Sequence, residues 1–123
     1  MKKNEHILVT GGLGYLGSHT VIELLQQNKK VIIVDNLSNS KKKMIQLIKK
    51  ITKKNFIFFK TDIRSKNLNK IFKKYKIYSV IHFAGLKSVK ESESKIDEYF
   101  DNNYFGSLNL LKIMNIHKCR KII

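Results

Sequence analysis

Short apolar runs alternate with amphipathic segments along this chain. Four apolar runs predict buried strands, at 6–10, 31–34, 56–60 and 79–83. Apolar residues spaced three or four apart predict helices between these strands, at 15–27, 41–51 and 68–75. A longer helix is predicted over 95–115, with apolar residues on more than one side, and residues 119–123 have the pattern of an opening fifth strand.

This alternation of strand and helix predicts an α/β fold. Strands that are joined by helices form a parallel sheet, and right-handed crossovers place helices on both of its faces. We therefore expect one Rossmann-like doubly wound domain over residues 1–123, with strand order 3-2-1-4-5, incomplete because the sequence stops at the start of the fifth strand. Ligands of such sheets bind beyond the carboxyl ends of the strands.

A glycine cluster joins the first predicted strand to the first predicted helix. Gly12, Gly14 and Gly17 follow the spacing G-x-G-x-x-G, directly after Thr10 and Gly11. Glycines there allow a tight turn and let a pyrophosphate approach the backbone without a Cβ between them. The start of the helix that follows supplies free N–H groups and a partial positive charge. The cluster therefore predicts a dinucleotide site.

Asp35 lies at the end of the second predicted strand, 18 residues after Gly17. A carboxylate at this position can accept hydrogen bonds from both hydroxyls of an adenosine ribose, and it would repel a 2′-phosphate. This favours NAD over NADP as the cofactor. The alternative is an aspartate that only ends the strand and opens a turn with Asn36 and Ser38.

Two more groups follow the third and fourth predicted strands. Asp62 can hydrogen-bond the adenine amino group while Ile63 packs on the ring; the alternative is that Asp62 caps the next helix. Gly85 would let the backbone pass close to the cofactor, and Lys87 would point toward its phosphates or its nicotinamide. His82 points inward from its strand and is interpreted as a core residue. No catalytic residue and no metal ligand is assigned.

Charge and composition narrow the function classes. The formal net charge is +16, but almost all of the 25 basic residues are lysines, and they are dispersed along the sequence. Proline and tryptophan are absent, which indicates a compositional bias rather than a selected polyanion-binding surface. Specific nucleic-acid recognition uses arginine forks and stacking aromatics on one basic face, so we expect no nucleic-acid partner.

We expect a cytoplasmic protein. Cys119 is the only cysteine, which excludes an intramolecular disulfide and a cysteine-based metal cluster and suits a reducing compartment. The apolar stretch after Lys2 and Lys3 is interrupted by glycines, unlike that of a secretory signal. No segment is long enough to span a membrane, so no membrane partner is expected.

Five segments together resemble UDP-glucose 4-epimerase, a family of extended short-chain dehydrogenases/reductases. They are the loop 10–20, the stretch 35–41, the group 62–64, the run 80–87 and the segment 101–103. The resemblance covers essentially the whole chain, in order and at near-family spacing. The glycine loop by itself indicates only the superfamily. The stretches 35–40 and 82–87 indicate the epimerases, which interconvert UDP-glucose and UDP-galactose in galactose metabolism.

The resemblance implies a set of NAD-binding residues. Tyr15 and Leu16 would lie against the pyrophosphate, and Asn102 would contact the cofactor from the long helix. The full set is Gly11, Gly12, Gly14, Tyr15, Leu16, Gly17, Asp35, Asn36, Leu37, Ser38, Asn39, Ser40, Asp62, Ile63, Phe83, Ala84, Gly85, Leu86, Lys87 and Asn102. Two departures lie outside this set: Ile96 stands where the family often has proline, and Phe105 where it has a polar residue.

The same resemblance implies that the catalytic half of the family's enzyme is missing. In the family, a tyrosine in the motif Tyr-x-x-x-Lys takes a proton from the sugar hydroxyl, and it follows the fifth strand. None of the 5 tyrosines of this sequence has a lysine four residues later. We expect the NAD-binding part of a UDP-glucose 4-epimerase, which would take a UDP-sugar only if a substrate region is supplied elsewhere. The alternative is an inert NAD-binding remnant or one half of a split enzyme. A homo-dimer through the helix over 95–115 is a further expectation.

Overall fold

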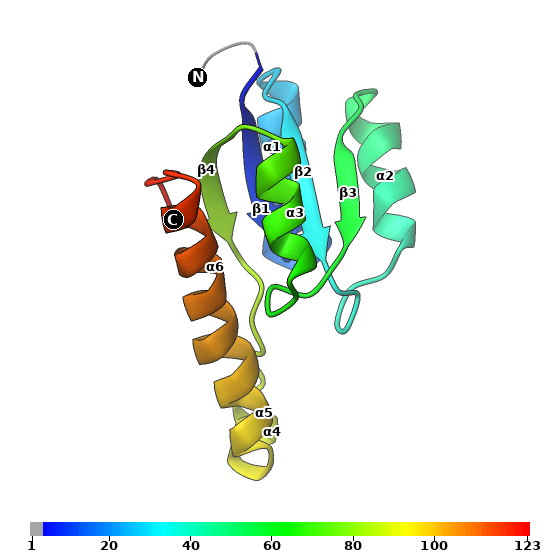
Figure 1. Cartoon of the computed structure of the whole chain (residues 1–123). Helices are drawn as coiled ribbons and strands as arrows, with labels where there is room; N and C mark the ends of the chain where they lie inside the picture. Colours follow the sequence, from blue (N-terminus) through cyan, green and yellow to red (C-terminus); the bar gives the residue numbers. More distant parts are fainter. Residues whose placement is uncertain (1–3) are drawn as a thin grey trace.

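The computed structural model of the chain describes residues 4–123. Lys2 and Lys3, which were used above to argue against a secretory signal, lie outside the described part. Strands and helices alternate as predicted, with bounds that shift by one or two residues (Figure 1). The elements are β1 (His6–Thr10), α1 (Tyr15–Gln26), β2 (Val31–Asp35), α2 (Lys43–Thr52), β3 (Ile57–Lys60), α3 (Asn67–Lys74) and β4 (Ile77–His82).

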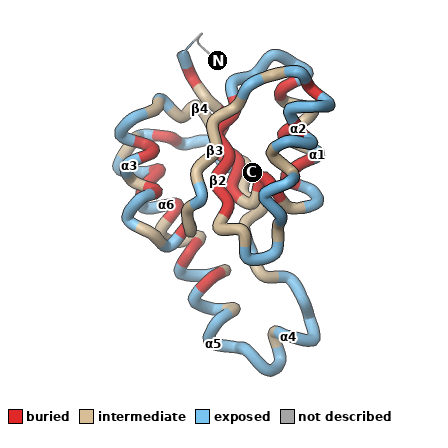
Figure 2. Tube along the Cα trace, turned by 90° about the vertical axis from the view of Figure 1, so that its right-hand side faces the viewer, coloured by how far each residue is buried: buried red, intermediate tan, exposed pale blue. Residues whose placement is uncertain are grey.

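All four strands are parallel and form one sheet in the order β3-β2-β1-β4, which confirms the predicted doubly wound topology. Successive side chains of a strand face opposite sides of a sheet. Leu8 and Ile32 therefore pack under α3 and α6 (Gly106–Ile116), whereas Val9 and Ile33 pack under α1 and α2. Because both faces are covered, the two central strands β1 and β2 are buried along almost their whole length (Figure 2).

The last residues of the chain extend the sheet beyond β4. Ile122 pairs in parallel with Val80, and the His82 N–H donates to the Ile123 carbonyl at 2.8 Å. The Val80 N–H donates to the Lys121 carbonyl at 2.9 Å. The predicted position of a fifth strand beside the fourth is thus confirmed, although so few residues run alongside β4 that they form a bridge rather than a strand.

The single helix predicted over 95–115 is confirmed as one continuous helical stretch over 96–116, with a π-helical turn in its middle that was not predicted. Three helical segments occupy this region: α5 (Ile96–Tyr99), a π-helical turn η1 (Phe100–Phe105) and α6. Asparagines and aromatic residues around η1 are weak helix formers, and the Asn103 amide is held by the backbone of Leu86, so the helix widens there.

A short helix, α4 (Val89–Ser94), precedes α5 and was not predicted. It has no apolar stripe, since Val89 is its only aliphatic residue; it begins where the Ser88 hydroxyl accepts a hydrogen bond from the Glu91 N–H. Together α4, α5 and η1 project beyond the carboxyl ends of the strands (Figures 1 and 2). Large apolar side chains are exposed along this projection and on α6, namely Ile96, Phe100, Tyr104, Phe105 and Leu111.

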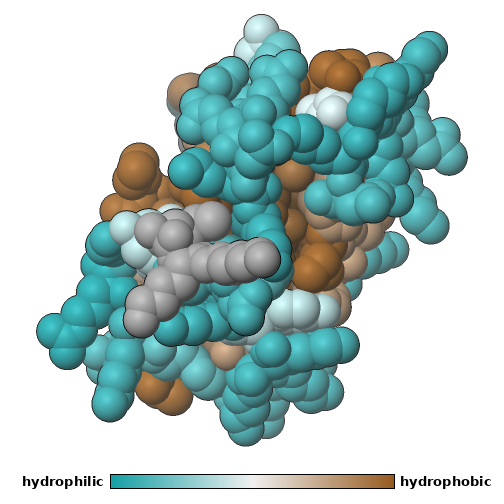
Figure 3. All heavy atoms as spheres, turned by 90° about the horizontal axis from the view of Figure 1, so that it is seen from above, coloured by the Kyte–Doolittle hydropathy of each residue, from teal (hydrophilic) through white to brown (hydrophobic). Residues whose placement is uncertain are grey.

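The opposite end of the molecule, where the strands begin, is mainly hydrophilic. Figure 3 shows polar side chains spread over this end, with hydrophobic ones visible between them. Polar side chains spread over a whole end of the molecule agree with the sequence, in which the lysines are dispersed and not clustered. Within residues 4–123, none of the helices has the length and apolar character that crossing a bilayer requires.

Candidate cofactor-binding site

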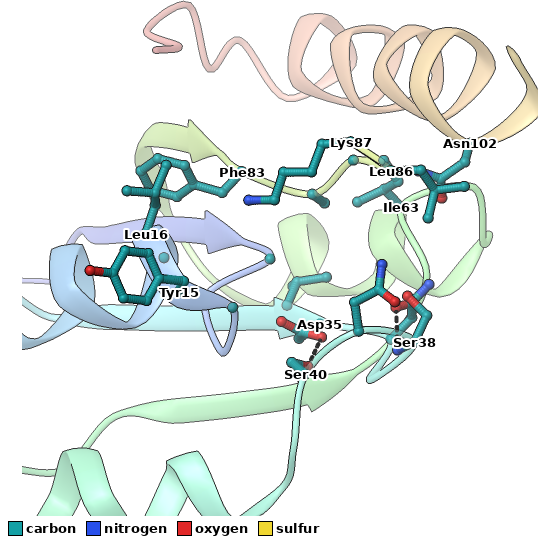
Figure 4. A pocket seen from close by; sticks show the side chains of 18 of the residues that line it. Tyr15, Leu16, Asp35, Ser38, Ser40, Ile63, Phe83, Leu86, Lys87 and Asn102 are labelled. Carbon is teal, nitrogen blue, oxygen red and sulfur yellow. Dashed lines mark hydrogen bonds between the residues drawn. The ribbon is translucent and has the colours of Figure 1, made fainter. Parts of the chain in front are cut away.

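A cleft of about 240 Å³ lies at the carboxyl ends of the strands. Asp35 and Ser40 lie on one side of it, and Phe83, Leu86 and Lys87 on the other (Figure 4). The cleft is smaller than the roughly 300–1,000 Å³ of pockets that enclose a whole drug-sized ligand. Its residues can therefore surround only part of a dinucleotide, and the rest would lie along the open surface.

The glycine loop is built from contacts between backbones. Gly11 has a φ of +64°, a left-handed conformation that suits glycine, and a Cβ at Gly11 would lie 2.7 Å from the Ala84 nitrogen. A Cβ at Gly17 would lie 2.2 Å from the Gly11 carbonyl oxygen. The start of α1, the glycine loop and the segment after β4 thus meet without side chains between them.

The amino end of α1 opens into this cleft. Gly14 is its N-cap residue, no side chain caps it, and its first turn holds no acidic residue. The side chains of Tyr15 and Leu16 are exposed and also line the cleft. The first N–H groups of a helix have no partner within the helix, so this end can receive a phosphate.

Asp35 connects two walls of the cleft although its side chain is buried. Its Oδ2 accepts a hydrogen bond from the Leu13 N–H of the glycine loop at 3.0 Å. Its Oδ1 accepts from the Leu37 N–H at 2.9 Å and from the Ser40 hydroxyl at 2.7 Å. Each carboxylate oxygen can accept two hydrogen bonds, so Oδ2 keeps one position open.

The two interpretations of Asp35 are compatible in this geometry. The bond from the Leu37 N–H opens a turn, and the next turn follows where the Ser38 N–H donates to the Asn36 Oδ1 at 3.0 Å. Asp35 therefore ends the strand, orders the loop after it and still borders the cleft. Leu37 has a φ of +63°, which is uncommon for a residue with a side chain, and this conformation tightens the loop.

Asp62 is engaged by neighbouring side chains. Its Oδ1 accepts from the Arg64 Nε at 2.8 Å, and its Oδ2 accepts from the Arg64 Nη2 at 2.8 Å and from the Asn36 Nδ2 at 2.9 Å. Arg64 also contacts Asp101. Asp62 does not cap α3, whose N-cap residue is Lys66; it opens a turn by accepting the Arg64 N–H at 2.9 Å. Any contact of this carboxylate with adenine would be shared with these donors.

The hydrogen bonds from Arg64 hold the pKa of the Asp62 carboxyl well below its usual range. A lowered folded-state pKa stabilises the fold above the unfolded-state value near 4, and this stabilisation disappears as the pH falls through the folded-state value. We expect Asp62→Asn to lower the free energy of unfolding by up to about 1 kcal/mol at pH 7, because the pair is partly exposed. Urea unfolding should show the difference shrinking below pH 4. A gap for Asp62→Asn that stays constant to pH 2 would contradict the expectation.

The other wall of the cleft is held by the π-helical turn. The Leu86 N–H donates to the Asn103 Oδ1 at 2.7 Å, and the Asn103 Nδ2 donates to the Leu86 carbonyl at 2.8 Å. The neighbouring Asn102 is buried and lines the cleft. Asn103 was not assigned a role from the sequence. The only local signal for it is two consecutive asparagines inside a helix, where their propensity is poor.

Most residues of the predicted set come together in the cleft. Three of them lie outside its lining, namely Gly12, Leu37 and Asp62. Gly12 packs against Ile33 instead. Two residues line it that were not predicted, Val34 and Thr61, each directly before a predicted one. In residues 4–123, no group of His, Cys, Asp and Glu side chains is placed to hold a metal ion.

Known proteins resemble this chain both in sequence and in fold. The family model of GDP-mannose 4,6 dehydratase matches residues 8–123. The UDP-glucose 4-epimerase of Dictyostelium discoideum is 47% identical over 98% of this chain and 35% of its own length.

Two solved structures of UDP-glucose 4-epimerases superpose closely on this chain. The enzyme of Bifidobacterium longum, in complex with NAD+ and UDP, has a TM-score of 0.93 and 43% identity over 95% of this chain and 35% of that one. The enzyme of Stenotrophomonas maltophila, with bound NAD and formylated UDP-arabinopyranose, has a TM-score of 0.92 and 40% identity over 96% and 35%. The chain thus spans about a third of the length of these relatives. It belongs to the UDP-glucose 4-epimerase family of NAD-dependent epimerases and dehydratases, of which it corresponds to the amino-terminal part.

Proposed function

We propose that this chain binds NAD in the cleft, as the cofactor-binding part of a UDP-glucose 4-epimerase. The observation that carries the proposal is the position of Asp35. Its carboxylate is buried at the end of β2, tied to the glycine loop through Leu13, with room for a further hydrogen bond. This arrangement suits a ribose whose neighbouring pyrophosphate lies on the glycine loop.

The residues present fit such a cofactor. Because Gly11 and Gly17 have no Cβ, the start of α1, the glycine loop and the segment after β4 pack backbone against backbone at the edge of the cleft. The uncapped start of α1 would bind the pyrophosphate, Asp35 the adenosine ribose, and the segment 83–87 the nicotinamide half. When bound, NAD would supply a hydride acceptor. The NAD in the solved B. longum relative supports this proposal.

We expect saturable binding of NAD, with NADP bound at least about tenfold more weakly, because the Asp35 carboxylate repels a 2′-phosphate at close range. Isothermal titration calorimetry with each dinucleotide measures the ratio. Titrations at two salt concentrations control for nonspecific attraction of phosphates to a chain of net charge +16. Equal affinity for both, or binding of NAD that vanishes at physiological salt, would contradict the proposal.

Action on a UDP-sugar is proposed only for the chain together with a substrate region, because the printed sequence holds no Tyr-x-x-x-Lys motif. A coupled assay for conversion of UDP-galactose to UDP-glucose, run on the NAD-loaded chain, separates the alternatives. Turnover would favour an enzyme that is active as it stands. NAD binding without turnover would favour an inert remnant or one part of a split enzyme.

Association through the projecting helices also stays a proposal. It is supported by the exposed side chains of Ile96, Phe100, Tyr104 and Phe105, which lie within one stretch of ten residues. Apolar surface of this kind marks sites where other polypeptides bind. A second copy of this chain is the proposed occupant.

A further inference from the structure

A series of hydrogen bonds runs behind the cleft from the segment after β4 to helix α6. The Ala84 N–H donates to the Thr10 Oγ1 at 3.3 Å, and this hydroxyl lies 2.6 Å from the His82 Nδ1. The His82 Nε2 lies 2.9 Å from the Ser107 hydroxyl, which donates to the Asn103 carbonyl at 2.6 Å. Each polar side-chain atom of the series has a partner on both sides.

The two ends of the series determine which nitrogen of His82 carries the proton. Because Thr10 accepts from the Ala84 N–H, its own hydrogen is available for the His82 Nδ1. Because the Ser107 hydrogen points to the Asn103 carbonyl, the Ser107 oxygen accepts from the His82 Nε2. Both ends therefore favour a neutral imidazole with the proton on Nε2.

The same series holds both ends of the segment that forms one wall of the cleft. Ala84 is tied to Thr10 on β1, and Leu86 is bracketed by Asn103, whose carbonyl ends the series. Ala84 and Leu86 line the cleft themselves, whereas His82 does not. Its imidazole thus joins β1 to α6 directly behind the wall.

We propose that His82, neutral and protonated on Nε2, is a positioning residue that fixes the segment 84–86 for the nicotinamide half of the dinucleotide. This inference rests on the proposed binding of NAD. Burial lowers the pKa of His82, which keeps the imidazole neutral at physiological pH. Asp35 and Ser40, which would hold the adenosine half, lie on the opposite side of the cleft (Figure 4).

The test compares the affinities for NAD and for AMP, since AMP reaches only the adenosine side. In His82→Phe both hydrogen bonds of the imidazole are lost, and the buried Thr10 hydroxyl is left without an acceptor. NAD binding should then weaken about tenfold, which is the size of effect that the loss of one net hydrogen bond produces. AMP binding should change less than about twofold. His82→Gln offers one acceptor and one donor and should restore NAD binding to within about threefold of wild type.

Two further variants complete the experiment. Ser107→Ala removes only the far partner and should weaken NAD binding by a few-fold, which keeps the test decisive if His82→Phe does not fold. His117→Gln is the matched control, because His117 is also half-buried and hydrogen-bonded, to Asn69 at 2.7 Å, but lies outside the cleft. The affinities for NAD and for AMP should both be unchanged in His117→Gln.

Nitrogen NMR of the imidazole should show a proton on Nε2 of His82. A proton on Nδ1, equal losses of NAD and AMP affinity, or unchanged NAD affinity in both His82→Phe and Ser107→Ala would each overturn the role of His82. A wild-type chain that binds no NAD would instead overturn the proposed function.

Discussion

Asp35→Asn is expected to weaken NAD binding about a hundredfold. A hydrogen bond to a charged acceptor contributes about 1.5–3 kcal/mol, and the proposed site uses the open position on the carboxylate for a ribose hydroxyl. The amide keeps one acceptor but turns its NH2 toward the Leu13 N–H or toward the Leu37 N–H, both of which donate to Asp35 now. A loss near 3 kcal/mol corresponds to about a hundredfold in affinity.

Calorimetric titration of NAD measures this loss, and a thermal melt of each apoprotein shows whether the variant is folded. The control is Asp97→Asn, which removes one charge from exposed helix α5 and should leave the affinity unchanged. A folded Asp35→Asn that binds NAD within threefold of wild type would rule out the carboxylate as the ribose acceptor.

Gly17→Ala is expected to have the largest effect on stability. The added methyl would lie 2.2 Å from the Gly11 carbonyl oxygen and 2.8 Å from the Gly12 Cα. Both are backbone atoms, so no side chain can rotate away, and the helix must move from the glycine loop. Overpacking of this kind lowers the free energy of unfolding by about 3 kcal/mol. For a domain of this size we expect the melting temperature to fall by roughly 10 °C.

Gly85→Ala is the matched control for this substitution. Its methyl would lie 3.4 Å from the Asn103 Oδ1, which is ordinary contact with a side chain. Differential scanning calorimetry of the two variants should therefore show a large shift for Gly17 and a shift of a degree or two for Gly85. Similar shifts for both would mean that the contact between Gly17 and Gly11 yields without strain.

The sheet was predictable from the sequence because its strands are buried on both faces. Residues 7–9 and 31–34 are continuously apolar, and such runs between amphipathic helices indicate parallel strands. The topology then places the segments after β1, β2 and β4 at one edge, so residues as distant as Gly11, Asp35 and Lys87 could be assigned to one cleft.

What the sequence did not show depends on contacts between distant residues. The partners of Asp62 include Asn36, 26 positions away, and the hold of Asn103 on Leu86 spans 17 positions. Neither distance leaves a trace in local periodicity. The π-helical turn inside the helix over 96–116 has the same origin, because it lies where Asn103 binds the segment after β4.

The backbone contacts of the glycine loop bear on how a lysine-rich, proline-free sequence can keep this architecture. Substitutions driven by nucleotide composition exchange one side chain for another, and most of the surface tolerates them because water is on the other side. Where main chain touches main chain, as between Gly17 and Gly11 or between Gly11 and Ala84, any residue other than glycine would place a Cβ against backbone atoms. Side chains on the outside of this protein can therefore change freely, whereas a change at Gly11 or Gly17 requires the main chain itself to shift.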